Sequence, residues 1–142
     1  MAQKTPILVV DDNSDDVFFL CRAFKKAGLN HSIIHVSDGE EAVDYLSGKN
    51  GFEDRSQHPL PTLMLLDVKM PKLNGFDVLQ WLLTRKDLEK LPVVMFSSSF
   101  EQEDVEQAKV LGATDYFTKP AGPEGFDQVV QTIAAKWLAS TE

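Results

Sequence analysis

Residues 63–67 read LMLLD, four consecutive apolar residues followed at once by the carboxylate of Asp67. An apolar run of this length, with no polar position, is typical of a strand that is buried on both faces, as in a parallel sheet. Similar short runs occur at residues 7–10, 93–96 and 116–118, with a weaker one at 33–36. The sequence therefore predicts five buried strands.

Helical patterns alternate with these runs. The first is bounded by Asn13 or Ser14 as its cap and by Gly28 as its stop. Further helices are predicted at 38–46, 76–85 and 103–111, and a last one from Pro123 through Trp137. Alternation of strand and helix implies right-handed crossovers, so we expect a doubly wound α/β fold with five parallel strands and five helices.

The length of 142 residues fits one domain. We expect residues 1–142 to form a single domain without an effector domain, so that any output leaves from its own surface. The one long loop, residues 48–61, is polar and rich in turn residues, which favours a surface insertion of unassigned role.

The formal net charge of -8 argues against unaided binding to nucleic acid or to an anionic membrane, because both rely on basic patches. No apolar run approaches the roughly 18 residues that span a membrane, and residues 1–6 contain no apolar signal core. We therefore expect a cytoplasmic protein whose partners are basic surfaces or bound cations.

Polar residues follow four of the predicted strands. Asp11 and Asp12 come after the first, Asp67 after the third, Ser97 after the fourth and Lys119 after the fifth. In open α/β sheets ligands bind beyond the carboxyl ends of the strands, so these side chains are expected to converge. Clustered carboxylates are tolerated when a hard cation such as Mg²⁺ takes up their charge, and the sequence therefore predicts a magnesium site.

Asp67 stands alone at the end of its strand, which suits a nucleophile that forms an acyl phosphate. Phosphoryl transfer requires charge stabilisation on the phosphoryl oxygens, and the Lys119 ammonium and the Ser97 hydroxyl can supply it. Asp16 is explained equally well as a helix-capping or helix-dipole residue. The histidines have no metal-ligand spacing and are expected in ordinary surface or packing roles; they are His31, His35 and His58.

The segments around these residues closely resemble the receiver domain of two-component response regulators over residues 7–138. Each segment alone is a weak signal, and their order makes the match specific. They are Val9-Val10-Asp11-Asp12, Leu65-Leu66-Asp67-Val68-Lys69-Met70-Pro71 with Asn74-Gly75, Leu91-Pro92-Val93-Val94-Met95-Phe96-Ser97, and Gly112-Ala113-Thr114-Asp115-Tyr116-Phe117-Thr118-Lys119-Pro120.

The resemblance implies a flavodoxin-like fold and assigns roles within the site. Asp67 would be the phosphoacceptor, and Asp12, Asp67 and the main-chain carbonyl of Lys69 would hold Mg²⁺, with Asp11 acting through water. Ser97 and Tyr116 would form the switch, the hydroxyl moving toward the phosphate and the aromatic ring turning inward. The resemblance also suggests a cis bond between Lys119 and Pro120.

The implied function is that of a single-domain response regulator, not an enzyme beyond its own phosphorylation and dephosphorylation. A sensor histidine kinase would phosphorylate Asp67, and the changed surface would signal to a separate downstream protein. The insertion at 48–61, its His58-Pro59 end and the turn at 71–75 resemble a subfamily that serves phytochrome-type kinases. The downstream protein and the formation of a homodimer are left open.

Three other functions compete with this interpretation. An aspartate-nucleophile phosphatase would place its nucleophile after the first strand, whereas the isolated Asp67 follows the third. A flavin-binding domain would have a Gly-rich or Ser/Thr-rich phosphate turn there, and the four aspartates between residues 11 and 16 would repel a phosphate. A receiver that acts only as an unphosphorylated interaction module stays open.

Overall fold

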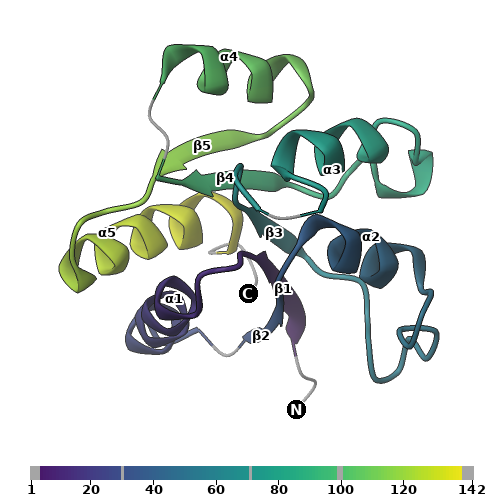
Figure 1. Cartoon of the computed structure of the whole chain (residues 1–142). Coiled ribbons are helices and arrows are strands. Elements are labelled where there is room, and N and C mark those ends of the chain that lie inside the picture. Colours follow the sequence, from purple (N-terminus) through teal and green to yellow (C-terminus); the bar gives the residue numbers. More distant parts are fainter. Residues whose placement is uncertain (1–3, 30, 71, 99–100, 139–142) are drawn as a thin grey trace.

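The computed structural model describes residues 4–29, 31–70, 72–98 and 101–138. Within them, five parallel strands form one sheet in the order β2-β1-β3-β4-β5. Helices α1 and α5 cover one face of the sheet, and α2, α3 and α4 cover the other (Figure 1). The predicted doubly wound α/β class is confirmed.

The elements follow one another in strict alternation. The strands are β1 Lys4–Val10, β2 His31–Val36, β3 Leu63–Leu66, β4 Val93–Ser97 and β5 Asp115–Thr118. The helices are α1 Ser14–Lys26, α2 Gly39–Ser47, α3 Gly75–Leu82, α4 Gln102–Val110 and α5 Pro123–Ile133, with short turns η1 Lys86–Leu88 and η2 Ala134–Leu138. None of the helices in the described ranges has the length and apolar character needed to cross a membrane.

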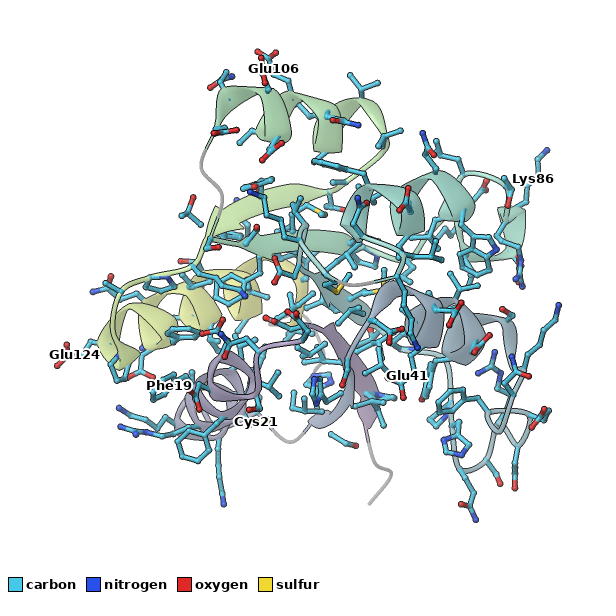
Figure 2. The ribbon with its side chains drawn as sticks, in the orientation of Figure 1. Phe19, Cys21, Glu41, Lys86, Glu106 and Glu124 are labelled. Carbon is cyan, nitrogen blue, oxygen red and sulfur yellow. The ribbon has the colours of Figure 1, made fainter. Side chains whose placement is uncertain are left out.

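Two hydrophobic cores lie on opposite faces of the sheet, because side chains alternate along each strand. Leu8 and Val10 of β1 pack under α2, α3 and α4, whereas Ile7 and Val9 pack under α1 and α5. On the second face, Phe19 of α1 points toward α5, and its ring centroid lies 5.4 Å from that of Phe126 (Figure 2). Since both faces of the central strands are covered, only their ends are available for polar chemistry.

Two predicted helix ends were wrong. Helix α3 ends at Leu82 rather than Arg85, because the backbone then tightens into i+3 hydrogen bonds and turns into η1, which buries Leu88. Helix α5 ends at Ile133, and the wider π-helical turn η2 follows it. The extra residue in that turn shifts the buried position, so that Leu138 is buried and Trp137 is only partly covered.

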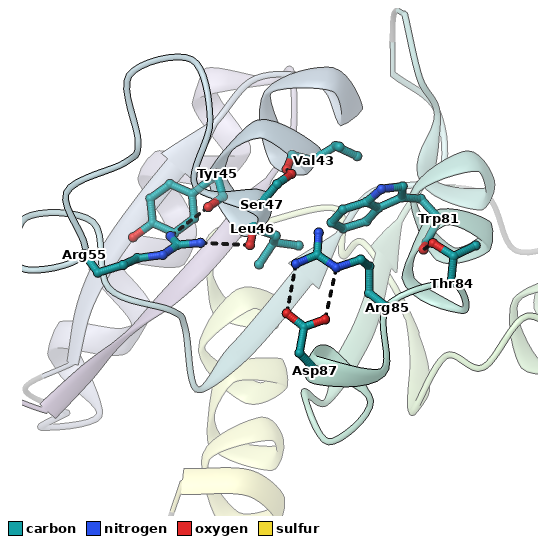
Figure 3. A network of polar contacts seen from close by, with 9 residues as sticks. All are labelled: Val43, Tyr45, Leu46, Ser47, Arg55, Trp81, Thr84, Arg85 and Asp87. Carbon is teal, nitrogen blue, oxygen red and sulfur yellow. Dashed lines mark hydrogen bonds and ion pairs between the residues drawn. The ribbon is translucent and has the colours of Figure 1, made fainter.

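The insertion at 48–61 is largely exposed, but it is anchored to the end of α2. The Arg55 guanidinium donates to the carbonyls of Tyr45 and Leu46, each at 2.9 Å (Figure 3). It also donates to the carbonyl of His58 at 3.0 Å. The Tyr45 hydroxyl donates to the Pro59 carbonyl at 2.7 Å. Arg55 thus adds donors at the end of α2, where the Tyr45 carbonyl also accepts from the Gly48 amide at 3.2 Å.

Candidate functional site

Three aspartates meet at the carboxyl ends of β1 and β3. Val10 pairs with Leu66 in the sheet, so the next residues, Asp11 and Asp67, face each other across the two strands. The Asp67 amide donates to the Val10 carbonyl at 3.0 Å, which holds Asp67 at this edge. Together with the exposed Asp12, they offer one carboxylate oxygen each within 4.8 Å of one another.

Lys119 reaches this cluster from the end of β5. Its amide donates to the Ser97 carbonyl at 2.7 Å, which ties the start of the loop to β4. Its ammonium lies 2.9 Å from Asp11 Oδ2, 2.8 Å from Asp16 Oδ2 and 3.0 Å from Asp67 Oδ2. Because the Lys119 side chain is only 10% exposed, all three ion pairs are shielded from water.

Sequence reasoning missed two contacts of this cluster. A capping or helix-dipole role was considered an equally good explanation for Asp16, and the structure shows that its carboxylate binds Lys119. His35 was expected in an ordinary surface or packing role; the residue is exposed, and its Nε2 lies 2.7 Å from the main-chain oxygen of Asp11, a contact that the sequence did not indicate. Neither contact has a local sequence signal, because the first depends on how β1 leads into α1 and the second on the register of β1 and β2.

Burial and charge perturb two groups in the site. Desolvation raises the pKa of Asp11 to about 6, although hydrogen bonds from Lys119 and from the Asn13 amide oppose the shift. Burial alone would lower the pKa of the Lys119 ammonium, but hydrogen bonds to Asp16 and Asp11 and the charge of Asp67 raise it above its ordinary value. The pocket therefore holds an ammonium among more carboxylates than it can neutralise.

Metal binding to this pocket is expected to weaken as the pH falls through about 6, where Asp11 becomes protonated. A carboxyl with a raised pKa binds its proton more tightly in the folded protein than in the unfolded chain. Protonation of Asp11 therefore stabilises the folded state but weakens metal binding. Calorimetric titration with Mg²⁺ should give about tenfold weaker binding one pH unit below this pKa than well above it. Equal affinity at both values would contradict the assignment, and Asp11→Asn should bind weakly at both.

Of the other predicted residues, Ser97 and Lys69 lie at the same edge of the sheet, whereas Tyr116 lies within β5 and pairs with Met95 in the middle of β4. Ser97, the last residue of β4, is fully buried, and it pairs with Thr118 of β5. Tyr116 is partly buried and lines a cavity of about 180 Å³ between α4 and β5. The Lys69 side chain is exposed two residues after Asp67. A larger cavity of about 360 Å³, beside Val93 at the start of β4, lies at the opposite edge of the sheet and contains none of these residues.

The turn after β3 is held closely against the site by glycine. The amide of Gly75, the first residue of α3, donates to the Val68 carbonyl at 2.8 Å. A Cβ atom at Gly75 would lie 2.3 Å from the Asp67 carbonyl oxygen, which no real side chain permits. The absence of a side chain at this position therefore lets α3 begin directly beneath Asp67.

The suggested cis bond between Lys119 and Pro120 was wrong. None of the peptide bonds in the described ranges is cis, so this one is trans. The trans form is favoured by about 0.5 to 1 kcal/mol even before proline. Lys119 reaches all three carboxylates with the bond in that form.

The donor set of the pocket fits a divalent cation. Asp11, Asp12 and Asp67 supply hard oxygen ligands, which suit Mg²⁺ or Mn²⁺ better than a soft metal. Lys119 lies against the same carboxylates and can move a short distance to a new anion. The arrangement can thus hold a metal, a reactive carboxylate and a compact positive charge side by side.

The fold and the pocket define a class of protein, a doubly wound α/β domain with an acidic metal site at the carboxyl ends of its strands. The sequence of residues 7–131 matches the family model of the response regulator receiver domain. The chain therefore belongs to the receiver-domain family of two-component response regulators, which act in phosphorylation-based signal transduction. Receiver domains bind a divalent metal at an acidic pocket of this kind and partner sensor histidine kinases.

Two curated relatives match over most of their length. The chain is 32% identical over 132 residues to the probable methanogenesis regulatory protein FilR2 of Methanothrix harundinacea, covering 93% of this chain and 83% of that one. It is 31% identical over 132 residues to the response regulator Rcp1 of Synechocystis, covering 93% and 88%.

Solved structures agree in fold. The phosphorylated cyanobacterial phytochrome response regulator RcpA superposes with a TM-score of 0.88 at 30% identity, covering 97% of this chain and 96% of that one. The Mn²⁺-bound form of Rcp1 superposes with a TM-score of 0.87 at 29% identity, covering 98% of each chain.

Proposed function

We propose that Asp67 accepts a phosphoryl group from a phosphohistidine of a sensor kinase. One Asp67 oxygen attacks phosphorus, the P–N bond breaks, and the leaving imidazole takes up a proton. The observation that carries the proposal is the Lys119 ammonium 3.0 Å from Asp67 Oδ2, inside a buried pocket of carboxylates. That ammonium can pass from Asp67 to a phosphoryl oxygen as negative charge develops there.

Asp12, Asp67 and the main-chain carbonyl of Lys69 would hold Mg²⁺, with Asp11 contributing through water. When bound, the metal supplies positive charge that offsets the incoming phosphoryl group. The close approach of the Asp11, Asp12 and Asp67 oxygens supports this assignment.

The Ser97 hydroxyl would donate to another phosphoryl oxygen once Asp67 carries the group. Tyr116 would then turn inward into the space released beside β4, and the cavity it lines next to α4 supports such a movement. Phosphorylation adds up to about two negative charges, so Ser97 and Lys119 would reorganise around them. The surface formed by α4 and β5 would change as a result.

The proposed phosphoryl donor is a phytochrome-type sensor histidine kinase. The proposed target of the signal is a separate downstream protein. The similarity to RcpA, a cyanobacterial phytochrome response regulator, supports the first. We further propose that the protein acts in the cytoplasm as a single receiver domain, catalyses only its own phosphorylation and dephosphorylation, and does not bind nucleic acid directly. The net charge of -8 supports the last point.

Phosphotransfer from a kinase tests this function. A purified phytochrome-type kinase is first labelled on its histidine with radioactive ATP. It should pass label to this chain about as fast as to its own regulator. The transfer should require Mg²⁺. A histidine kinase of another sensor class should transfer label far more slowly. Equal transfer from both kinases would contradict the phytochrome assignment, and transfer from neither, together with no binding of beryllofluoride, would favour a plain interaction module.

A further inference from the structure

The ion pairs of Lys119 fall into two kinds. Asp11 and Asp67 belong to the cluster that offers oxygens to a metal, so a bound cation and Lys119 would compete for them. Asp16 lies outside that cluster, and its 2.8 Å separation from the ammonium is the shortest of the three. Asp16 is therefore the one partner that Lys119 can keep when metal and phosphoryl group occupy the site.

The beginning of α1 explains why Asp16 is available. Asn13 caps the helix by accepting from the Asp16 amide at 3.1 Å, which fixes the backbone of Asp16. An acidic residue at this third helical position ordinarily reaches back to the amide of the cap residue. Here that amide already donates to Asp11 Oδ1 at 2.9 Å, so the Asp16 carboxylate does not receive it.

Helix α3 shows the ordinary arrangement for comparison. Asn74 accepts from the Asp77 amide at 3.0 Å, and the Asp77 carboxylate accepts from the Asn74 amide at 3.1 Å, which completes a capping box. The two helices thus begin with the same pair of residue types at the same spacing. They differ because Asp11, rather than Asp16, accepts the hydrogen bond from the amide of the cap residue. The Asp16 carboxylate forms an ion pair with Lys119 instead.

We propose that Asp16 is a positioning residue that anchors the Lys119 ammonium independently of the metal-binding carboxylates. With this anchor, Lys119 stays at the site while Asp67 changes from a free carboxylate into an acyl phosphate. Without it, Lys119 would bind only Asp11 and Asp67 and would compete more strongly with the metal. The inference rests on the proposed phosphoryl transfer to Asp67.

The variant Asp16→Asn tests the anchor, with Asp15→Asn as the matched control. Asp15 is exposed on the same turn of α1, so its replacement removes an equal charge without touching Lys119. We expect Asp16→Asn to take up phosphoryl groups from acetyl phosphate about tenfold more slowly than the wild type, a loss typical of residues that orient a metal site. We also expect the variant to bind Mg²⁺ more weakly than the wild type. Asp15→Asn should stay close to the wild type in both.

A double-mutant cycle with Lys119→Met separates positioning from a general loss of charge. In the Lys119→Met background, Asp16→Asn should cause no further loss of phosphorylation or of Mg²⁺ affinity. The nitrogen NMR signal of the Lys119 ammonium, recorded without metal, should shift in Asp16→Asn and not in Asp15→Asn. This last measurement does not depend on phosphorylation.

The outcomes distinguish the two proposals. A wild type that takes up no phosphoryl group would overturn the proposed function and the positioning role with it. Normal phosphorylation of the wild type, with Asp16→Asn indistinguishable from Asp15→Asn in rate, Mg²⁺ affinity and Lys119 signal, would overturn the positioning role alone. Equal losses from Asp16→Asn with and without Lys119 would also overturn it.

Discussion

Asp67→Asn is expected to lower phosphoryl uptake by more than about a thousandfold, because the amide has no anionic oxygen to attack phosphorus. The side chain keeps its size, and one negative charge leaves a crowded cluster, so the folded structure should persist. Radiolabel from acetyl phosphate, retained on the protein after gel filtration, measures the effect. Thermal unfolding of the same samples shows whether the fold is intact.

Asp15→Asn is again the matched control for this experiment. It removes the same charge from an exposed position and should leave uptake of label unchanged. Label on Asp67→Asn at the level of the wild type would show that another residue accepts the phosphoryl group. Equal losses in both variants would show that the site responds to overall charge rather than to its nucleophile.

Gly75→Ala is expected to lower the free energy of unfolding by about 3 kcal/mol, because a Cβ atom there would overlap main-chain atoms that cannot rotate away. The nearest are the Asp67 carbonyl oxygen at 2.3 Å and the Val68 Cα at 3.0 Å. Relief of the overlap must move the backbone that carries Asp67, so Mg²⁺ affinity should fall as well. Urea unfolding and calorimetry measure the two effects.

Gly122→Ala provides the comparison for this variant. Nothing lies within 4 Å of a Cβ atom at Gly122, so the change should cost less than about 1 kcal/mol and leave Mg²⁺ affinity unaltered. Equal stability of Gly75→Ala and Gly122→Ala would contradict the close packing of α3 beneath Asp67.

The convergence of strand-end residues could be predicted because it follows from burial alone. Leu63–Leu66 is a run that only a covered strand tolerates, and the observed β3 has the predicted bounds. Once the strands are parallel neighbours, the residues after them must lie at one edge, which places Asp67 beside Asp11. Neither inference needs the position of any single side chain.

The partner of Asp16 could not be predicted in this way. Asn13 and Asp16 have the same spacing as Asn74 and Asp77, and local sequence alone favours a capping box in both helices. The difference lies in the hydrogen bond from the Asn13 amide to Asp11, which depends on how β1 leads into α1. The π-helical turn after Ile133 also escaped prediction, because regular helical spacing favours Trp137 as the buried residue, whereas Leu138 is buried.

Chemical trapping of the phosphorylated residue tests the central claim most directly. Borohydride reduces an aspartyl phosphate to homoserine, and tandem mass spectrometry of the digested protein locates that residue. After incubation with a phosphodonor and Mg²⁺, we predict homoserine at position 67 and at no other aspartate. Homoserine at another position, or unmodified Asp67 in protein that has retained label, would contradict the account.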